Sequence, residues 1–291
     1  MSWPASVRRS AAARGIALVL LSAAAYGAMP ILARVAYAEG TRLATLLTWR
    51  FVVAVLVFVA TSRGTPPLPW RTRLLLWGLG IVFVLNSLSY FLALERVPVP
   101  VLALLLYTYP VIVTLLSALA GIDPLTPRNL LAAVLAFAGA ALTAGPVAGA
   151  QLPGVALALT AAFIYSVYIV LSSRFARGVS SEAAARHVAQ AAAVFYIVIA
   201  AVRGELAPPT SPAAILAILG MGAVCTVLAM RAFLAGVVVI GPARASVLSA
   251  FEILVTLVLA AVFLGERPGP QALVGGGLIF AGVALQQMAR R

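Results

Sequence analysis

Residues 242–264 read PARASVLSAFEILVTLVLAAVFL, an apolar run with one carboxylate, Glu252, near its middle. A helix that crosses a bilayer needs about 20 mainly apolar residues, so this run is long enough to span. Glu252 follows Pro242 by ten residues, which is about 15 Å along a helix. We therefore predict that it lies near the middle of a hydrocarbon core about 30 Å thick. Exposure to lipid there costs on the order of 2.5–3.5 kcal/mol, so the carboxylate must face protein or water.

Apolar runs of this kind recur along the whole chain. Hydrophobic residues make up 64% of the 291 residues and charged residues 9%, too few charges for a water-facing surface. The gaps between the runs are short and rich in Pro and Gly, as in turns. We predict an all-α polytopic membrane protein with about ten transmembrane helices. The predicted spans are 15–37, 43–61, 73–94, 97–119, 128–145, 153–173, 183–202, 213–234, 242–264 and 270–289.

The basic residues predict the orientation of these spans. There are 20 basic residues, all arginine, against 7 acidic ones, for a net charge of +13. Most of them lie in gaps between apolar runs, which is typical of cytoplasmic loops at an anionic leaflet rather than of nucleic-acid binding; Arg34, Arg50, Arg231 and Arg244 fall within or at the edges of spans. We expect a multi-pass protein of the cell inner membrane, with the lipid bilayer as a partner and both termini cytoplasmic. In that orientation twelve arginines lie inside (8, 9, 14, 63, 71, 73, 128, 174, 177, 186, 290 and 291) and four outside (42, 96, 203 and 267).

The two halves of the chain resemble each other. A shift of 143 residues lays 97–142 on 240–285, so that Phe137-Ala138-Gly139 falls on Phe280-Ala281-Gly282. We predict two five-helix repeats, at 1–146 and 147–291. Because five is odd, the second repeat crosses the membrane in the opposite sense. Inverted repeats around a central cavity are how many secondary transporters build two interconvertible states.

Several motifs, taken in order and spacing, resemble a known family. They are Trp49-Arg50-Phe51, Tyr107-Thr108-Tyr109-Pro110-Val111, Gly154…Tyr165-Ser166…Tyr168, Phe251-Glu252-Ile253 and Leu264-Gly265-Glu266. The layout is similar to the drug/metabolite transporter superfamily, in its ten-helix EamA-type branch, which includes exporters of aromatic amino acids. The resemblance implies an inner-membrane exporter of small metabolites that needs no cofactor. The chain departs from the family pattern at Tyr26-Gly27, where Trp-Gly is usual, and at Gly121-Ile122-Asp123, where a Gly-Glu pair is expected.

Two charged residues within the spans are candidates for substrate binding. Glu252 is predicted to share a helix face with Ser249 and Thr256, while Leu254, Val258 and Ala261 lie on the opposite face. The carboxylate is either a substrate-amine contact or proton carrier, or a structural group bonded to a neighbouring helix. Arg50 either receives a substrate carboxylate, or snorkels to the interface, or pairs structurally with Glu252; a structural role is favoured.

A second set of candidates is polar or aromatic and lies at helical spacing on the predicted spans. Functionally, such stripes would line a cavity that accepts an apolar side chain and a polar head group. The alternative is hydrogen bonding between helices and interfacial aromatic belts. The predicted substrate-binding residues are Glu252, Arg50, Tyr26, Asn86, Tyr90, Tyr107, Tyr165, Tyr168, His187 and Ser249.

Catalytic and metal-binding constellations are missing from the sequence. Asp123 is the only aspartate, Cys225 the only cysteine and His187 the only histidine, so an aspartate pair and a His/Cys metal cluster are both excluded. Without lysine there is no phosphate-binding loop for ATP. We expect a transporter of small amphipathic molecules, most favourably amino acids, and not an enzyme. Lipophilic cations, with Glu252 as counter-charge, are the alternative substrate, and a structural or receptor protein is the alternative class. A passive facilitator is slightly favoured over proton coupling, and a monomer or weak homodimer is expected.

Overall fold

A computed structural model of the chain describes residues 5–61, 68–94, 96–97, 99–144, 152–265 and 269–287, and the regular structure in these ranges is helical. Seven helices are long and apolar enough to cross a membrane, and three shorter apolar helices accompany them. In order, they match the predicted spans and confirm an all-α, multi-pass membrane protein. The elements are α1 (Ala5–Gly27), α2 (Met29–Ala38), α3 (Leu43–Thr61), α4 (Trp70–Leu94), α5 (Val99–Leu106), α6 (Tyr109–Leu119), α7 (Pro127–Ala144), α8 (Leu152–Phe175), α9 (Ser181–Arg203), α10 (Pro212–Gly222), the π-helix η1 (Ala223–Leu228), α11 (Ala229–Ile240), α12 (Pro242–Ser249), α13 (Phe251–Leu264) and α14 (Pro270–Gln287).

Three predicted spans are each broken into two helices, at the junctions α1–α2, α5–α6 and α12–α13. Pro30 and Pro110 lie in the first turn of α2 and α6, where a missing N–H and a ring clash interrupt the preceding helix. The third break has no proline. There Ser246 and Ser249 donate hydrogen bonds to the carbonyls of Ala243 and Ala245, both at 2.9 Å, and such back-bonding bends helices.

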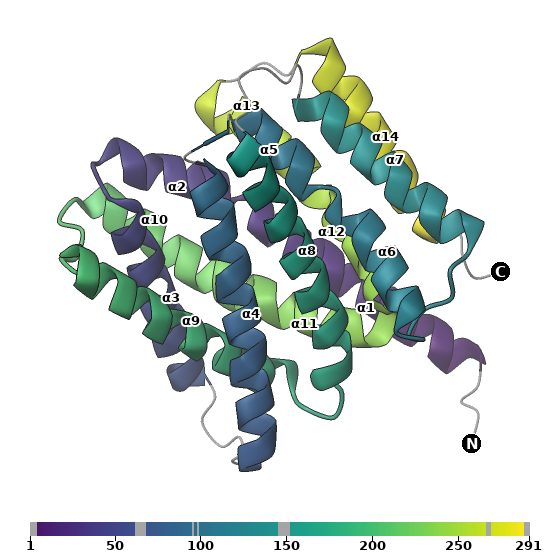
Figure 1. Cartoon of the computed structure of the whole chain (residues 1–291), viewed down its shortest axis with the longest axis horizontal. Coiled ribbons are helices and arrows are strands. Elements are labelled where there is room, and N and C mark those ends of the chain that lie inside the picture. The colour runs from purple at the N-terminus through teal and green to yellow at the C-terminus, as the bar shows by residue number, and fades with distance from the viewer. Residues whose placement is uncertain are drawn as a thin grey trace.

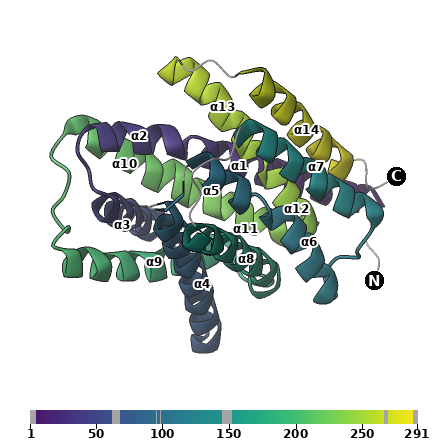
Figure 2. The same ribbon diagram turned by 45° about the horizontal axis from the view of Figure 1, so that its top comes forward.

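The last helices of the two repeats, α7 and α14, lie side by side and antiparallel (Figures 1 and 2). Near the start of α7, Arg128 Nε donates to the carbonyl of Leu285 at 3.1 Å. Further along α7, Gly139 lies against Gly275 of α14. Along the contact, residue numbers therefore increase on α7 and decrease on α14, as expected for antiparallel helices. Glycine is required here, because a Cβ at Gly139 would lie 2.5 Å from the Gly275 carbonyl oxygen. Small residues at this contact therefore allow α7 and α14 to pack closely within the chain.

The second helices of the repeats, α3 and α9, are also antiparallel. Thr45 Oγ1, early in α3, donates to the carbonyl of Glu205, just after α9, at 2.8 Å. Thr61, at the end of α3, donates to a carboxylate oxygen of Glu182, near the start of α9, at 3.4 Å. Since equivalent helices of the two repeats run in opposite directions, the inverted repeat is confirmed.

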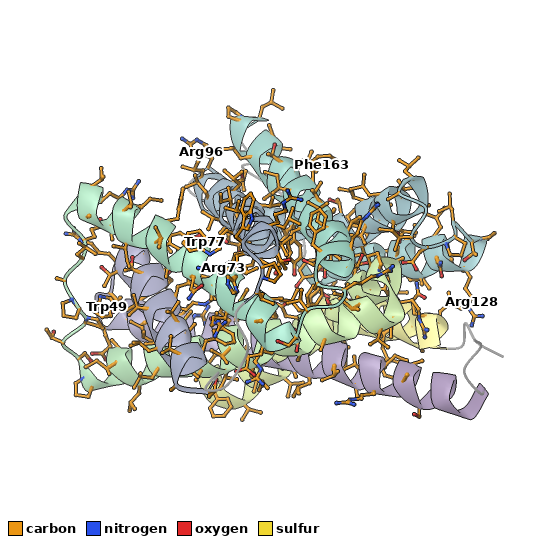
Figure 3. The ribbon with its side chains drawn as sticks, turned by 90° about the horizontal axis from the view of Figure 1, so that it is seen from below. Trp49, Arg73, Trp77, Arg96, Arg128 and Phe163 are labelled. Atoms are coloured by element: carbon orange, nitrogen blue, oxygen red, sulfur yellow. The ribbon has the colours of Figure 1, made fainter. Side chains whose placement is uncertain are left out.

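Large apolar side chains lie on the exterior of the bundle, among them Phe163, which is labelled in Figure 3. Phe163 is exposed by 51% and Leu216 by 70%. The buried core includes Phe51, Phe58 and Leu76. Apolar residues on both sides of each helix are typical of a protein that faces lipid.

Candidate functional site

Aromatic rings form a continuous series through the centre of the bundle. It begins at the α5–α6 junction, crosses α8 and α4, and ends on α3 and α9, so it joins both repeats. We call this series the aromatic chain. Its successive ring centroids are separated by 5.8 Å (Tyr107–Tyr109), 5.0 Å (Tyr109–Tyr165), 6.2 Å (Tyr165–Tyr168), 5.4 Å (Tyr168–Phe83), 6.1 Å (Phe83–Phe51) and 5.6 Å (Phe51–Tyr196). Separations of this size are favourable for aromatic pairs.

Glu252 lies in the first turn of α13, directly after the break at the end of α12, and is partly buried. Its carboxylate makes no hydrogen bond or ion pair with any residue that the structure describes. A carboxylate at this depth is costly without a positively charged or hydrogen-bonding partner. The site is therefore suited to a cationic group. The groups within electrostatic range of Glu252 include Tyr26, Tyr90, Tyr107, Tyr109, Tyr165 and Arg50.

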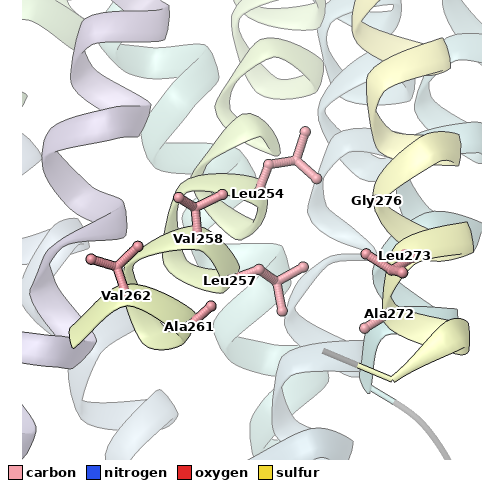
Figure 4. A pocket seen from close by; sticks show the side chains of 8 residues that line it. All are labelled: Leu254, Leu257, Val258, Ala261, Val262, Ala272, Leu273 and Gly276. Atoms are coloured by element: carbon pink, nitrogen blue, oxygen red, sulfur yellow. The ribbon is translucent and has the colours of Figure 1, made fainter. Parts of the chain in front are cut away.

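The opposite face of α13 is apolar, as the helical spacing predicted. Leu254, Val258 and Ala261 line a groove of about 370 Å³ between α13 and α14 (Figure 4). The groove is completed by Leu257, Val262, Ala272, Leu273 and Gly276, and no charged residue lines it. The α13 helix thus presents its aliphatic residues to α14 and its carboxylate to the tyrosines.

Arg50 is held by the π-helix η1. Its Nε donates to Thr226 Oγ1 at 2.7 Å, and its terminal nitrogen donates to the carbonyl of Cys225 at 3.3 Å. Thr226 in turn donates to the carbonyl of Met221 at 2.9 Å. A π-helix leaves backbone acceptors displaced from the regular ladder, and the guanidinium, only 6% exposed, satisfies one of them. Of the alternatives that the sequence left open for Arg50, these contacts favour a structural role.

The structure separates the other predicted site residues into two groups. Tyr26, Tyr90, Tyr107 and Tyr165 lie within electrostatic range of Glu252, and the Tyr168 ring stacks on that of Tyr165 at a centroid separation of 6.2 Å. Asn86 Nδ2 donates to the carbonyl of Ala161 at 2.8 Å and so ties α4 to α8. Ser249 bonds the carbonyl of Ala245 and lies beside the Tyr109 side chain.

His187 is not brought to Glu252. It lies in the second turn of α9, where its Nδ1 is 2.7 Å from the carbonyl oxygen of Ala183. Its side chain lines a separate pocket that also contains Arg73, Arg186 and Gln190. The substrate-binding role predicted for His187 therefore finds no support from its position.

Tyr109 is a site residue that the helical stripe missed. The stripe assumed an unbroken helix through Tyr107, but the chain breaks between α5 and α6 and rotates the following face. The 143-residue shift, however, places Tyr109 on Glu252. The structure agrees with that equivalence: Ser166 on α8 donates to the Tyr109 carbonyl at 3.3 Å, and Gly27 on α1 closely approaches the carbonyl of Glu252.

The two ends of the bundle are packed differently. Where α12 begins, it packs against α6, α7 and α8, and nearly all of its residues are buried. The inverted repeat makes α5 the counterpart of α12, and α13, α14 and α1 the counterparts of α6, α7 and α8. Within the described part of the chain, α5 has no comparable packing against α13, α14 or α1. Correspondingly, Asn86, Tyr90, Tyr107 and Glu252 remain partly exposed. We call the α12 side the closed end and the opposite side the open end.

Comparison with known proteins gives relatives over nearly the full length. The chain is 28% identical over 286 residues to the uncharacterized transporter YcbK of Bacillus subtilis (strain 168), covering 92% of this chain and 91% of that protein. It is 28% identical over 282 residues to an uncharacterized transporter of Archaeoglobus fulgidus, covering 93% and 95%. It is also 32% identical over 143 residues to the aromatic amino acid exporter YddG of Ancylobacter novellus, covering 46% and 50%.

The fold itself has a solved counterpart. A crystal structure superimposes with a TM-score of 0.83 over 98% of this chain and 99% of that one, at 24% sequence identity. The model of the EamA-like transporter family matches the chain twice, at residues 13–145 and at residues 152–286, once for each five-helix repeat. The two matches leave only the ends and a short connection uncovered, and the chain belongs to the EamA-like transporter family.

Proposed function

We propose that this protein is a secondary transporter that exports small amphipathic metabolites by alternating access, with neutral and aromatic amino acids as the favoured substrates. The observation that carries the proposal is Glu252, a carboxylate at the centre of the bundle without a hydrogen-bond or ion-pair partner among the described residues. A substrate ammonium group would supply that partner. The faces of Tyr107 and Tyr165 would add cation–π attraction, and an apolar side chain would rest on the aromatic chain.

The relatives support the same substrate class. The YddG protein of Ancylobacter novellus is an aromatic amino acid exporter by name, and its match covers about half of each chain. The uneven packing of the two ends supports alternating access. In a transporter built from inverted repeats, the two repeats can exchange their conformations, which opens the closed end and closes the open one.

We place the protein in the cell inner membrane with both termini cytoplasmic, so that the closed end faces the cytoplasm. The arginines near that end, which include Arg128, Arg174 and Arg177, support this orientation. We propose a facilitator that needs no cofactor, performs no catalysis, binds no nucleic acid and works as a monomer or weak homodimer. Glu252 is the group through which proton coupling would otherwise run.

The test is transport by purified protein in liposomes. We expect labelled phenylalanine or threonine to enter protein-containing liposomes faster than empty ones, at a rate that a pH gradient does not change. Glu252→Gln should lower the rate at least about tenfold, because a charge-assisted contact worth about 1.5–3 kcal/mol is lost. Glu205→Gln is the matched control: it removes the same charge from a loop ion pair with Arg42, whose side chain is 73% exposed, and should change the rate by less than about twofold. Transport of no amino acid would refute the amino-acid assignment.

A second candidate substrate class is lipophilic cations. The unpaired carboxylate of Glu252 among several tyrosines favours it, since such a cage suits organic cations. Tetraphenylphosphonium and phenylalanine should be compared in the same liposomes. Glu252-dependent uptake of the cation without uptake of any amino acid would select this alternative.

A further inference from the structure

A carboxylate fastens the closed end across the two repeats. Asp123 lies in the loop between α6 and α7, and its Oδ2 accepts a hydrogen bond from the backbone N–H of Ala243, in the first turn of α12, at 3.0 Å. Gly241, two residues before Ala243, has a φ of 84°, and a Cβ there would lie 2.5 Å from Asp123 Oδ1. The carboxylate thus occupies a space that only glycine leaves open, and it satisfies an N–H that the first turn of a helix cannot pair internally.

Two arginines add bonds at the same end. Arg244, the residue after Ala243, donates to the carbonyl of Gln286 at 3.0 Å. Arg128, at the start of α7, donates to the carbonyl of Leu285 at 3.1 Å. Both carbonyls belong to the last turn of α14, where a helix provides no N–H of its own to donate to them. Asp123, Arg128 and Arg244 together join the α6–α7 loop, α7, α12 and α14 into one closed assembly.

The sequence of the open end keeps a carboxylate, Glu266, at the position of Asp123 but lacks the donors of these bonds. Under the 143-residue shift, Ala243 corresponds to Pro100, which has no N–H to donate. Arg244 corresponds to Val101 and Arg128 to Gln271, so both guanidinium groups are missing. The repeat is therefore symmetric in its helices but asymmetric in the groups that fasten its ends.

We infer that Asp123, Arg128 and Arg244 form a one-sided latch, which holds the α12 end closed and biases the resting protein toward the conformation open at the other end. The inference rests on the proposed alternating access. For the site to open at the α12 end, α12 must leave α6, and the Asp123–Ala243 bond must break. At the other end Pro100, Val101 and Gln271 do not carry the same donor groups, so the two conformations differ in free energy by the latch contacts. These residues act on access to the site and touch no substrate.

The latch can be tested by side-specific cysteine labelling without any substrate. In a Cys225→Ala background, Ser246→Cys reports on the closed end, where Ser246 is fully buried in α12, and Ser89→Cys reports on the partly exposed α4 segment near the open end. A membrane-impermeant maleimide is applied to right-side-out and inside-out vesicles. Arg174→Cys and Arg203→Cys, both exposed, mark the two sides. Each reporter is combined with wild-type Asp123, Asp123→Ala or Asp123→Asn.

Asp123→Ala should raise the labelling of Ser246→Cys from the Arg174 side by about fivefold, the change expected for one lost helix cap. Labelling of Ser89→Cys from the opposite side should fall at the same time. Asp123→Asn keeps an acceptor oxygen and should restore the wild-type pattern. Arg128→Gln should shift both reporters as Asp123→Ala does.

Labelling that rises at both reporters would mean general loosening of the fold and would overturn the latch, as would no change at either reporter. Because no substrate is used, a protein that fails to transport amino acids still gives a clear result. Intact transport with unchanged labelling would refute the latch alone.

Discussion

Replacing Gly275 by alanine should separate α14 from α7. A Cβ at this position would lie 2.5 Å from the carbonyl oxygen of Gly139, about 0.9 Å short of ordinary van der Waals contact. The Cβ would also meet the Thr143 hydroxyl and the Thr143 backbone nitrogen. The hydroxyl can rotate away, but the backbone atoms cannot, so the helices must move apart. Overpacking of this kind costs about 1–3 kcal/mol. Alanine also favours a helix over glycine by about 0.8–1.0 kcal/mol, so the steric effect has to be measured against a control.

Gly277 provides that control, because it lies two residues away on the same helix and a Cβ there meets nothing within 4 Å. Both substitutions gain the higher helix propensity of alanine, but only Gly275→Ala also creates a steric clash with α7. Thermal unfolding in detergent, followed by circular dichroism, should place the apparent Tm of Gly275→Ala on the order of 2–10 °C below that of Gly277→Ala. Equal melting temperatures would show that α7 and α14 do not approach as closely as described.

Two further substitutions test the charged groups. Arg50→Ala should destabilise the fold by about 1.5–3 kcal/mol, because the Cys225 carbonyl and Thr226 hydroxyl lose a charged donor; an unchanged Tm would show that Arg50 does not support η1. Burial raises the pKa of Asp123, against the lowering effect of the Ala243 N–H and of Arg177 and Arg244. Because the pKa is raised in the folded state, the ionised carboxylate destabilises the fold at pH values above that pKa. This destabilisation disappears as the pH falls below the pKa of the unfolded state. Asp123→Asn should therefore melt above wild type near about pH 8, and the difference should vanish toward about pH 4; a difference that grows on acidification would contradict the burial argument.

The span positions could be predicted because hydropathy is a local property of the chain. The predicted cavity stripe through Tyr107 assumed an unbroken helix, whereas the chain breaks between α5 and α6, so the residues after the break lie on a rotated face. His187 has a plausible residue type, but its pocket at the start of α9 is set by neighbours such as Arg73, far away in sequence.

Apolar periodicity and the 143-residue repeat were sufficient to specify a multi-pass bundle of two inverted copies. They were sufficient because a bilayer imposes a length and a polarity on each segment separately. Only the tertiary structure showed three features. They are the tyrosines within electrostatic range of Glu252, the hydrogen bond from Arg50 to Thr226 of η1, and the hydrogen bond between Asp123 and the first turn of α12. Each of these depends on contacts between segments more than 80 residues apart, about which no single helix carries information.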